Sequence, residues 1–159
     1  IFDVRNFANV CQPMQHDRSA RSDRRCRHNL NYWTFGDYLG IGAGAHGKLT
    51  SHAGVIRETR RKHPRDYLDA AARGEFALDR RDIASRELPF EFMLNALRLC
   101  GGFNPRLFTE RTGLSLSRLQ RQLLNAQREG LLEVTRDHIA PTLRGQRFLN
   151  MLLREFLAS

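Results

Sequence analysis

The chain has 159 residues, of which 41% are hydrophobic and 27% are charged, an ordinary composition for a globular protein. No run of about 18 apolar residues occurs, which excludes a transmembrane helix. The formal net charge is +9, and residues 1–65 carry most of it, with 12 Lys and Arg against 5 Asp and Glu.

A basic half suggests an anionic partner, such as nucleic acid, a carboxylate-bearing ligand or a membrane surface. Arginine, however, supplies 24 of the 26 basic residues. A bias of this kind also arises from the codon usage of a whole genome. The charge alone therefore does not identify a partner.

Residues 1–7 alternate like a strand, and residues 1–10 are read as this strand and its exit. The chain opens inside this pattern with Ile1 instead of Met, so it is expected to be part of a longer protein. Residues 9–25 are polar, rich in arginine and without periodicity, which favours a solvated loop or insert.

The unusual chemistry lies in residues 28–66. Four side chains suited to ligand contact occur in one short run: His28, Asn29, Tyr32 and Trp33. Residues 37–44 then predict a short buried strand that leads into a glycine-rich turn. The glycines of this region are Gly40, Gly42, Gly44 and Gly47. They let the backbone pass close to a ligand or to another chain segment.

The string from Gly42 to Gly47 fits the pattern G-x-G-x-x-G, but residues 48–57 after it predict a hairpin. A dinucleotide site needs a helix at that point, so this match is weak.

Residues 67–159 predict a mostly helical domain. Start and stop signals bound helices at 67–74, 89–100, 104–113 and 115–130, and a last helix runs through 148–157. A hairpin is expected at 131–141. The helix at 115–130 should bury one apolar stripe: Leu119, Leu123, Leu124 and Ala126. Helix, helix, hairpin and helix in this order predict a winged-helix-like arrangement.

Two segments resemble a known family. Residues 26–33 read Cys-Arg-His-Asn-Leu-Asn-Tyr-Trp, and residues 36–47 read Gly-Asp-Tyr-Leu-Gly-Ile-Gly-Ala-Gly-Ala-His-Gly. They are similar to the H-N-x-x-Y-W and Y-L-G-I-G-x-G-A-H segments of the radical-SAM heme chaperones, which are relatives of oxygen-independent coproporphyrinogen III oxidase. The resemblance covers nearly the whole chain except residues 11–25, where the family has a very short link. This stretch reads as a lineage-specific insertion or a frameshifted segment.

The resemblance implies an α/β plus α fold. Residues 1–66 would be the last strands of a partial TIM-type radical-SAM barrel, with the Arg-rich insert at 9–25, and residues 67–159 the helical C-terminal domain. An intact, cytoplasmic member of the family holds a 4Fe–4S cluster on a C-x-x-x-C-x-x-C loop and uses S-adenosylmethionine. Cys11, Cys26 and Cys100 are too widely spaced to imitate that loop. This chain alone is therefore not expected to be an enzyme.

The resemblance also suggests ligand-binding residues. His28 is a candidate axial ligand to heme iron, because a neutral imidazole binds that iron well. Tyr32 and Trp33 would pack on the porphyrin, and Asn29 would orient a propionate or the imidazole. Cys26 is a weaker candidate for contact with heme. The purely structural alternative is that His28 and Asn29 bond to nearby backbone and Trp33 belongs to the core.

The glycine-rich turn supplies a second set of candidates. Gly42, Gly44 and His46 would line a cofactor or substrate pocket, or His46 would simply bond to backbone. Four arginines would face propionates or acidic lipid, or lie on a solvated surface: Arg57, Arg60, Arg61 and Arg65.

Three functions follow as hypotheses. The first is a part of a heme chaperone that binds heme and delivers it to acceptor proteins. The second is the sister activity, oxidation of coproporphyrinogen III. The third is a winged-helix module that binds nucleic acid through the residues Ser117, Arg118, Arg121, Gln122, Arg128 and Arg136. Residues 66–159 are nearly neutral, so nucleic acid is not expected as a partner. Peripheral contact with a membrane and the oligomeric state stay open.

Overall fold

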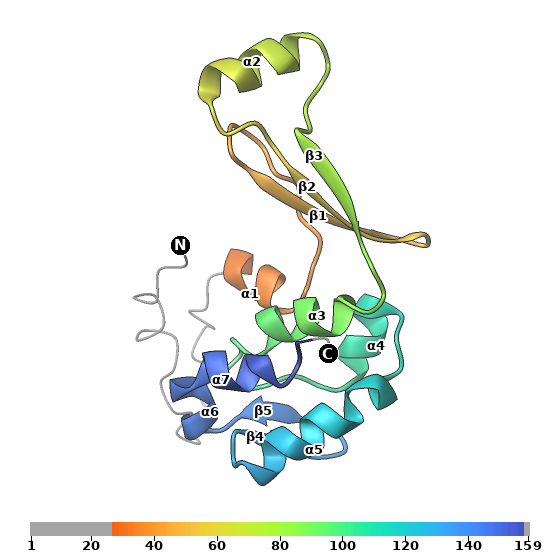
Figure 1. Cartoon of the computed structure of the whole chain (residues 1–159), viewed down its shortest axis with the longest axis vertical. Helices are drawn as coiled ribbons and strands as arrows, with labels where there is room; N and C mark the ends of the chain where they lie inside the picture. The colour runs from red at the N-terminus through yellow and green to blue at the C-terminus, as the bar shows by residue number, and fades with distance from the viewer. Residues whose placement is uncertain (1–26, 158–159) are drawn as a thin grey trace, which may run out of the picture.

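The computed structural model describes residues 27–157, and the strand and insert predicted within residues 1–26 lie outside this range. Figure 1 shows two parts, a sheet with one helix that projects away and a helical domain below it. Helix α1, Arg27–Trp33, contacts helix α3 of the helical domain. The elements are of mixed α and β type, as the sequence predicted.

The projecting part is a three-stranded antiparallel sheet in the order β1-β2-β3. β1 is His46–Ser51, β2 is Gly54–Thr59 and β3 is Asp79–Ile83. The hairpin of β1 and β2 confirms the prediction for residues 48–57, with Ser51 paired to Gly54 across the turn. Helix α2, Pro64–Ala72, connects β2 to β3 and starts with a proline in its first turn.

The sequence analysis missed β3, which pairs with β2 although it follows the expected boundary after residue 66. The strands described here are antiparallel, whereas the strands of a TIM-type barrel are parallel. The barrel therefore stays a prediction.

The buried strand predicted at residues 37–44 is wrong. Only Tyr38 pairs, through an isolated bridge to Lys48. Leu39 is 66% exposed and Ile41 is 85% exposed. The apolar spacing is present, but the described residues supply no second layer that covers these side chains.

The helical domain follows the predicted order. It contains α3 at Leu88–Ala96, α4 at Arg106–Thr112, the 3-10 helix η2 at Leu116–Leu119, α5 at Gln120–Arg128, β4 at Leu132–Val134, β5 at Ile139–Pro141, α6 at Leu143–Arg147 and α7 at Leu149–Arg154. The Ser115 hydroxyl accepts a hydrogen bond from the Ser117 N–H, as expected of an N-cap. Gly113 ends α4 with a φ of 70°. The winged-helix identity of this arrangement stays a prediction.

Two details of the helical domain differ from expectation. The last helix, predicted over 148–157, ends earlier, as α7, and a short helix that was not predicted, α6, precedes it; Phe148, with φ and ψ of −112° and 39°, separates the two. Leu124 is 46% exposed, so the buried stripe consists of Leu119 of η2 with Leu123 and Ala126 of α5.

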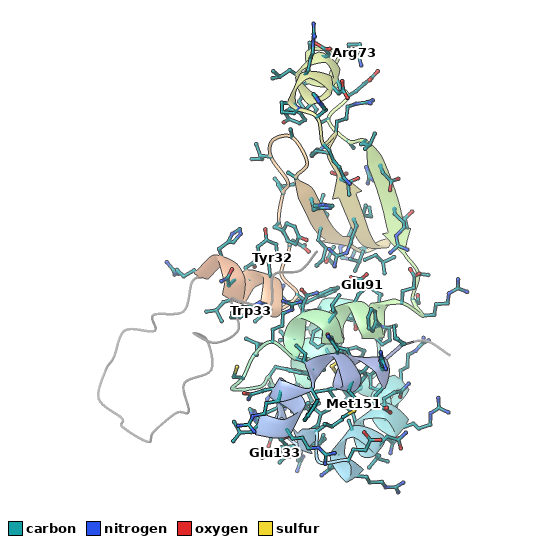
Figure 2. All side chains as sticks on the ribbon, turned by 60° about the vertical axis from the view of Figure 1, so that its left-hand side comes forward. Tyr32, Trp33, Arg73, Glu91, Glu133 and Met151 are labelled. Atoms are coloured by element: carbon teal, nitrogen blue, oxygen red, sulfur yellow. The ribbon has the colours of Figure 1, made fainter. Side chains whose placement is uncertain are left out.

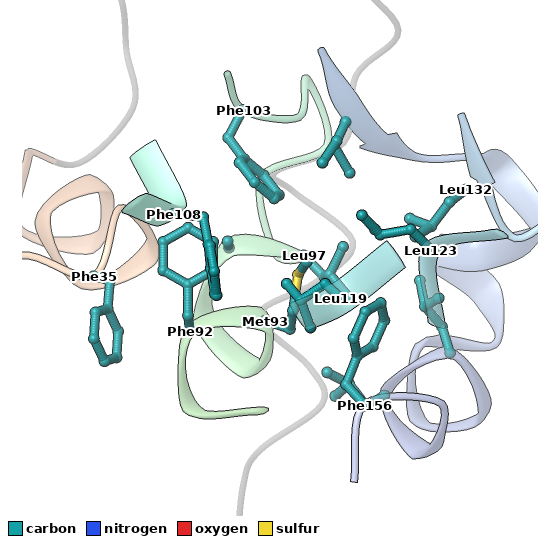
Figure 3. Close-up of a cluster of buried hydrophobic side chains, with 14 of the residues drawn as sticks. Phe35, Phe92, Met93, Leu97, Phe103, Phe108, Leu119, Leu123, Leu132 and Phe156 are labelled. Atoms are coloured by element: carbon teal, nitrogen blue, oxygen red, sulfur yellow. The ribbon is translucent and has the colours of Figure 1, made fainter. Parts of the chain in front are cut away.

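The core is centred on aromatic side chains (Figure 3). Phe92 of α3 is fully buried and meets Phe35, Phe103 and Phe108 edge to face, at ring-centroid distances of 5.7, 5.3 and 5.2 Å. Val55 and Ile83, partners across β2 and β3, join the same core. Only the near end of the sheet is thus buried in the helical domain. Within residues 27–157, no helix has the length and apolar character needed to cross a membrane.

Candidate functional site

Three aromatic rings form a continuous row beside α1. The imidazole of His28 lies edge-on to the ring of Tyr32, with 4.5 Å between centroids, because positions four apart share one face of a helix. Tyr32 in turn lies 4.3 Å from the ring of Tyr38. His28 is exposed, and no hydrogen bond to its imidazole is found within residues 27–157. The row therefore presents a free imidazole on an aromatic support.

Asn29 and Trp33 do not lie on this row. Figure 2 shows Tyr32 on the side of α1 that faces the sheet and Trp33 on the side that faces the helical domain. Trp33 is half-buried and packs against the core, as in the structural alternative. The Asn29 side chain is exposed. Of the four side chains predicted in this run, the structure brings together His28 and Tyr32.

Burial raises the pKa of Tyr32, and the neighbouring Tyr38 phenol raises it further. The phenol of Tyr32 is therefore protonated at neutral pH. It can offer ring packing and an O–H donor.

The glycine-rich turn lies apart from α1, at the α2 end of the sheet. The N–H of Gly42 donates to the hydroxyl of Tyr67 in α2 at 3.3 Å, and the N–H of Gly44 donates to the carbonyl of Arg61 at 2.7 Å. Both glycines have positive φ, 97° and 71°, which side chains disfavour. His46 is exposed at the start of β1. These contacts show the turn supporting its own chain, and no contact joins it to His28.

The close approach of the backbone to another segment, predicted from the glycines, is found at Gly40. A Cβ atom at this position would lie 2.5 Å from the carbonyl oxygen of His46 and 2.6 Å from its carbonyl carbon. The neighbour is backbone and cannot move aside cheaply. The bulky neighbour at this glycine is thus another segment of the chain.

We expect Gly40→Ala to lower the free energy of unfolding by about 1–3 kcal/mol, because the added methyl must push the start of β1 away. Urea unfolding followed by circular dichroism measures this. Ala43→Ser adds one heavy atom at an exposed position of the same turn and should change stability by less than about 0.5 kcal/mol. Equal effects of the two variants would contradict the close approach.

Three of the four candidate arginines already have acidic partners. Arg57 Nη2 lies 2.6 Å from Glu91 Oε2 of α3, and Arg57 Nη1 donates to the Tyr38 hydroxyl at 3.1 Å. Burial alone would lower the pKa of Arg57, but Glu91 and Tyr38 together raise it. Arg60 pairs with Glu58 at 3.4 Å, and Arg61 with Glu75 at 3.9 Å. These arginines are therefore poorly available for propionates or lipid. Arg65 is exposed.

The sequence analysis missed an ion pair between the buried Lys48 of β1 and Asp37, whose side chain is 42% exposed. Lys48 is only 1% exposed; its Nζ lies 2.7 Å from Asp37 Oδ1 and 4.2 Å from the centre of the Phe35 ring. Asp37 also accepts bonds from the N–H and the hydroxyl of Thr50, at 3.0 and 2.8 Å. This cluster fixes the segment that carries Tyr38 to β1. The sequence contained one indication that Lys48 is special: it is one of only two lysines in a chain with 24 arginines.

No group of three or more His, Cys, Asp or Glu side chains within residues 27–157 is arranged to hold a metal ion. Of the three cysteines, Cys100 alone lies in this range and is half-buried, whereas Cys11 and Cys26 lie outside it. The candidates for nucleic-acid binding lie in η2, in α5 and, for Arg136, in the turn between β4 and β5. Leu116 and Leu119 of η2 pack into the core, as expected.

Comparisons with known proteins agree with the class suggested by the motifs. Residues 83–148 match the family model described as "HemN C-terminal domain". A solved structure with a similar fold is that of coproporphyrinogen III oxidase (HemN) from Escherichia coli, a radical SAM enzyme. The TM-score is 0.53 and the sequence identity 14%, over 76% of this chain and 28% of that one. Residues 83–148 are thus similar to the HemN C-terminal domain, and the fold of the chain is similar to that of HemN.

The more specific relatives are heme chaperones. The chain is 42% identical over 139 residues to the heme chaperone HemW of Haemophilus influenzae, and 41% identical over 140 residues to that of Escherichia coli. Both alignments cover 87% of this chain, and 35% and 36% of the relatives. The HemW of Bacillus subtilis is 30% identical over 140 residues. The chain is a relative of the HemW heme chaperones, which confirms the predicted resemblance, and it spans about a third of their length.

Proposed function

We propose that this chain is part of a heme chaperone and that it binds heme on the exposed face of α1. The observation that supports this most directly is the free imidazole of His28 on the Tyr32–Tyr38 ring pair, in a chain related to proteins named heme chaperones. Heme is here the cargo, which the protein would pass on to acceptor proteins in the cytoplasm.

The residues of α1 fit heme chemically. An exposed imidazole without an intramolecular hydrogen bond can coordinate iron without breaking a contact in the protein. The ring of Tyr32 holds the imidazole edge-on, which limits its rotation. Exposure suits a chaperone, because a ligand that must be transferred is better held at the surface than enclosed. Asn29, one residue along the same exposed turn, would meet a propionate.

A radical-SAM barrel with a 4Fe–4S cluster and S-adenosylmethionine would come from the remainder of a longer protein, with residues 1–66 at the end of that barrel. The edge at Leu39 and Ile41 supports this arrangement. Both side chains are exposed, and no hydrogen bond to the backbone of Leu39 is found within residues 27–157. A further strand could pair there and cover the two side chains. Gly42, Gly44 and His46 would then face the barrel.

We expect His28→Ala to weaken heme binding by about tenfold or more and to shift the Soret band, because the iron loses its imidazole ligand. Titration of the chain with hemin, followed by absorbance, measures both quantities. Tyr32→Ala should weaken binding less and leave the band in place, since it removes packing only. Trp33→Ala is less informative, because Trp33 also packs against the core.

His138→Ala is the matched control. His138 is an exposed histidine in the turn between β4 and β5, far from α1 along the chain, so its loss should leave affinity and spectrum unchanged. The ligand assignment fails if His28→Ala and His138→Ala bind hemin alike with the wild-type spectrum.

A further inference from the structure

A stripe of exposed apolar and basic side chains follows α6 and α7. It consists of Leu143, Arg144, Arg147, Phe148, Met151 and Arg154, and is called the α6–α7 stripe below. Its members are the exposed large apolar and basic side chains of these two short consecutive helices and of Phe148 between them. The other side of these helices is buried, with Leu152 fully inaccessible and Phe156 3% exposed. The stripe is thus an outward face, not a part of the core.

The apolar members of the stripe are unusually exposed for their size. Leu143 is 73% exposed, Phe148 54% and Met151 39%. Figure 2 shows Met151 on the outer surface of the helical domain. Nothing among the described residues covers this face.

The arginines of the stripe differ from those of the sheet. Arg57, Arg60 and Arg61 have acidic partners, whereas within residues 27–157 none of Arg144, Arg147 and Arg154 forms an ion pair. Arg144 donates only to the backbone carbonyl of Glu129, at 3.0 Å. The stripe therefore combines uncompensated positive charge with exposed apolar side chains.

We propose that the α6–α7 stripe docks the protein on an anionic lipid surface, with Leu143, Phe148 and Met151 inserted between headgroups and the arginines on lipid phosphates. Arginines beside large apolar side chains on one helical face are typical of helices that lie in a membrane interface. Each arginine near an anionic leaflet should strengthen binding about fivefold.

An acidic protein partner is the other occupant that the charge would fit, but a lipid surface fits the shape better. Tight protein contacts usually seat an anchor side chain in a pocket. The cavity beside α1 and α4, lined by Leu30, Phe103 and Leu107 among others, includes no residue of the stripe. A row of exposed apolar and basic side chains suits a fluid surface, which needs no matching shape.

The test uses the 159-residue chain and vesicles of phosphatidylglycerol with phosphatidylcholine, or of phosphatidylcholine alone, in a flotation assay. The wild type should float with the anionic vesicles and much less with the neutral ones. Leu143→Ser with Phe148→Ser should reduce partition at least about tenfold, because less apolar surface leaves water. Arg147→Gln with Arg154→Gln should reduce it about twentyfold.

Arg118→Gln with Arg121→Gln is the charge-matched control, since both arginines are exposed on η2 and α5, outside the stripe. It should change partition less than twofold. An equal loss in this control would mean that net charge alone drives binding and would overturn the proposal. Unchanged flotation of the apolar variant would also overturn it, in favour of a purely electrostatic contact such as an acidic protein makes. Circular dichroism confirms that each variant is folded.

Discussion

Replacement of Phe92 by alanine is expected to lower the free energy of unfolding by about 3–5 kcal/mol. Phe92 is fully buried and is the one side chain that meets three other rings in the described core. Its partners come from the segment after α1, the connection before α4, and α4 itself. Their rings cannot all move into the space that is left, so a cavity should remain.

The measurement is urea unfolding of the chain, followed by circular dichroism at 222 nm. Phe76→Ala is the matched control, because it makes the same chemical change at a side chain that is 51% exposed, and it should cost about 1 kcal/mol or less. A loss below about 1 kcal/mol for Phe92→Ala would show that the four rings do not form the packing centre of this domain.

The helices were predictable because their ends carry local signals. Gly113 and Gly130 adopt positive φ, 70° and 68°, where the helix before each of them stops. Ser115 provides the N-cap expected of it. These preferences depend on a few neighbouring residues, and so they survive in any tertiary context.

The sheet was only partly predictable. The hairpin of β1 and β2 follows from local turn chemistry, but β3 has the sequence Asp-Arg-Arg-Asp-Ile, with one apolar residue. Its existence depends on pairing with β2, from Val55 opposite Ile83 to Thr59 opposite Asp79. The apolar spacing of Leu39 and Ile41 led to the opposite error, a buried strand that the structure does not contain. Burial of a strand requires a covering layer, and the spacing of apolar residues does not show whether one is present.

The candidate site shows the same division. The contact of His28 with Tyr32 follows from their spacing on a helix. The contact of Tyr32 with Tyr38 does not, because it requires the chain to reverse at Phe35, a non-glycine residue with a φ of 55°. Which arginines are ion-paired also depends on contacts across the fold, such as that between Arg57 and Glu91.

Removal of the Asp37 carboxylate is expected to destabilise the chain by about 2–3 kcal/mol, since Asp37→Ala leaves the buried Lys48 ammonium without its counter-ion. The loss is smaller than for a fully buried pair, because the Asp37 side chain is 42% exposed and water screens part of its attraction. Burial already lowers the pKa of Lys48, although the Asp37 carboxylate opposes this. The partners of Asp37 on Thr50 lose their acceptor as well. Glu110→Ala removes an exposed carboxylate with no ion-pair partner among the described residues, and should change stability by less than about 0.5 kcal/mol.

The double variant Asp37→Ala with Lys48→Met separates charge from packing. Methionine keeps most of the lysine volume under Phe35 and needs no counter-ion, so the double variant should regain at least half of the loss. A double variant as unstable as Asp37→Ala would mean that the hydrogen bonds to Thr50 dominate, and that the buried charge of Lys48 matters little.

The pH dependence of stability gives an independent check on the same pair. Burial alone would raise the pKa of Asp37, but the bonds from Lys48 and Thr50 outweigh it and hold the pKa below its usual value. The folded state then releases the Asp37 proton more readily than the unfolded state does. Asp37 therefore stabilises the fold above its unfolded pKa of about 3.9, and this contribution is lost as the pH falls through the lower, folded value. Urea unfolding between pH 6 and pH 3 should show a stability difference between wild type and Asp37→Ala that shrinks at the acid end. A difference that stays constant over this range would contradict the ionised pair.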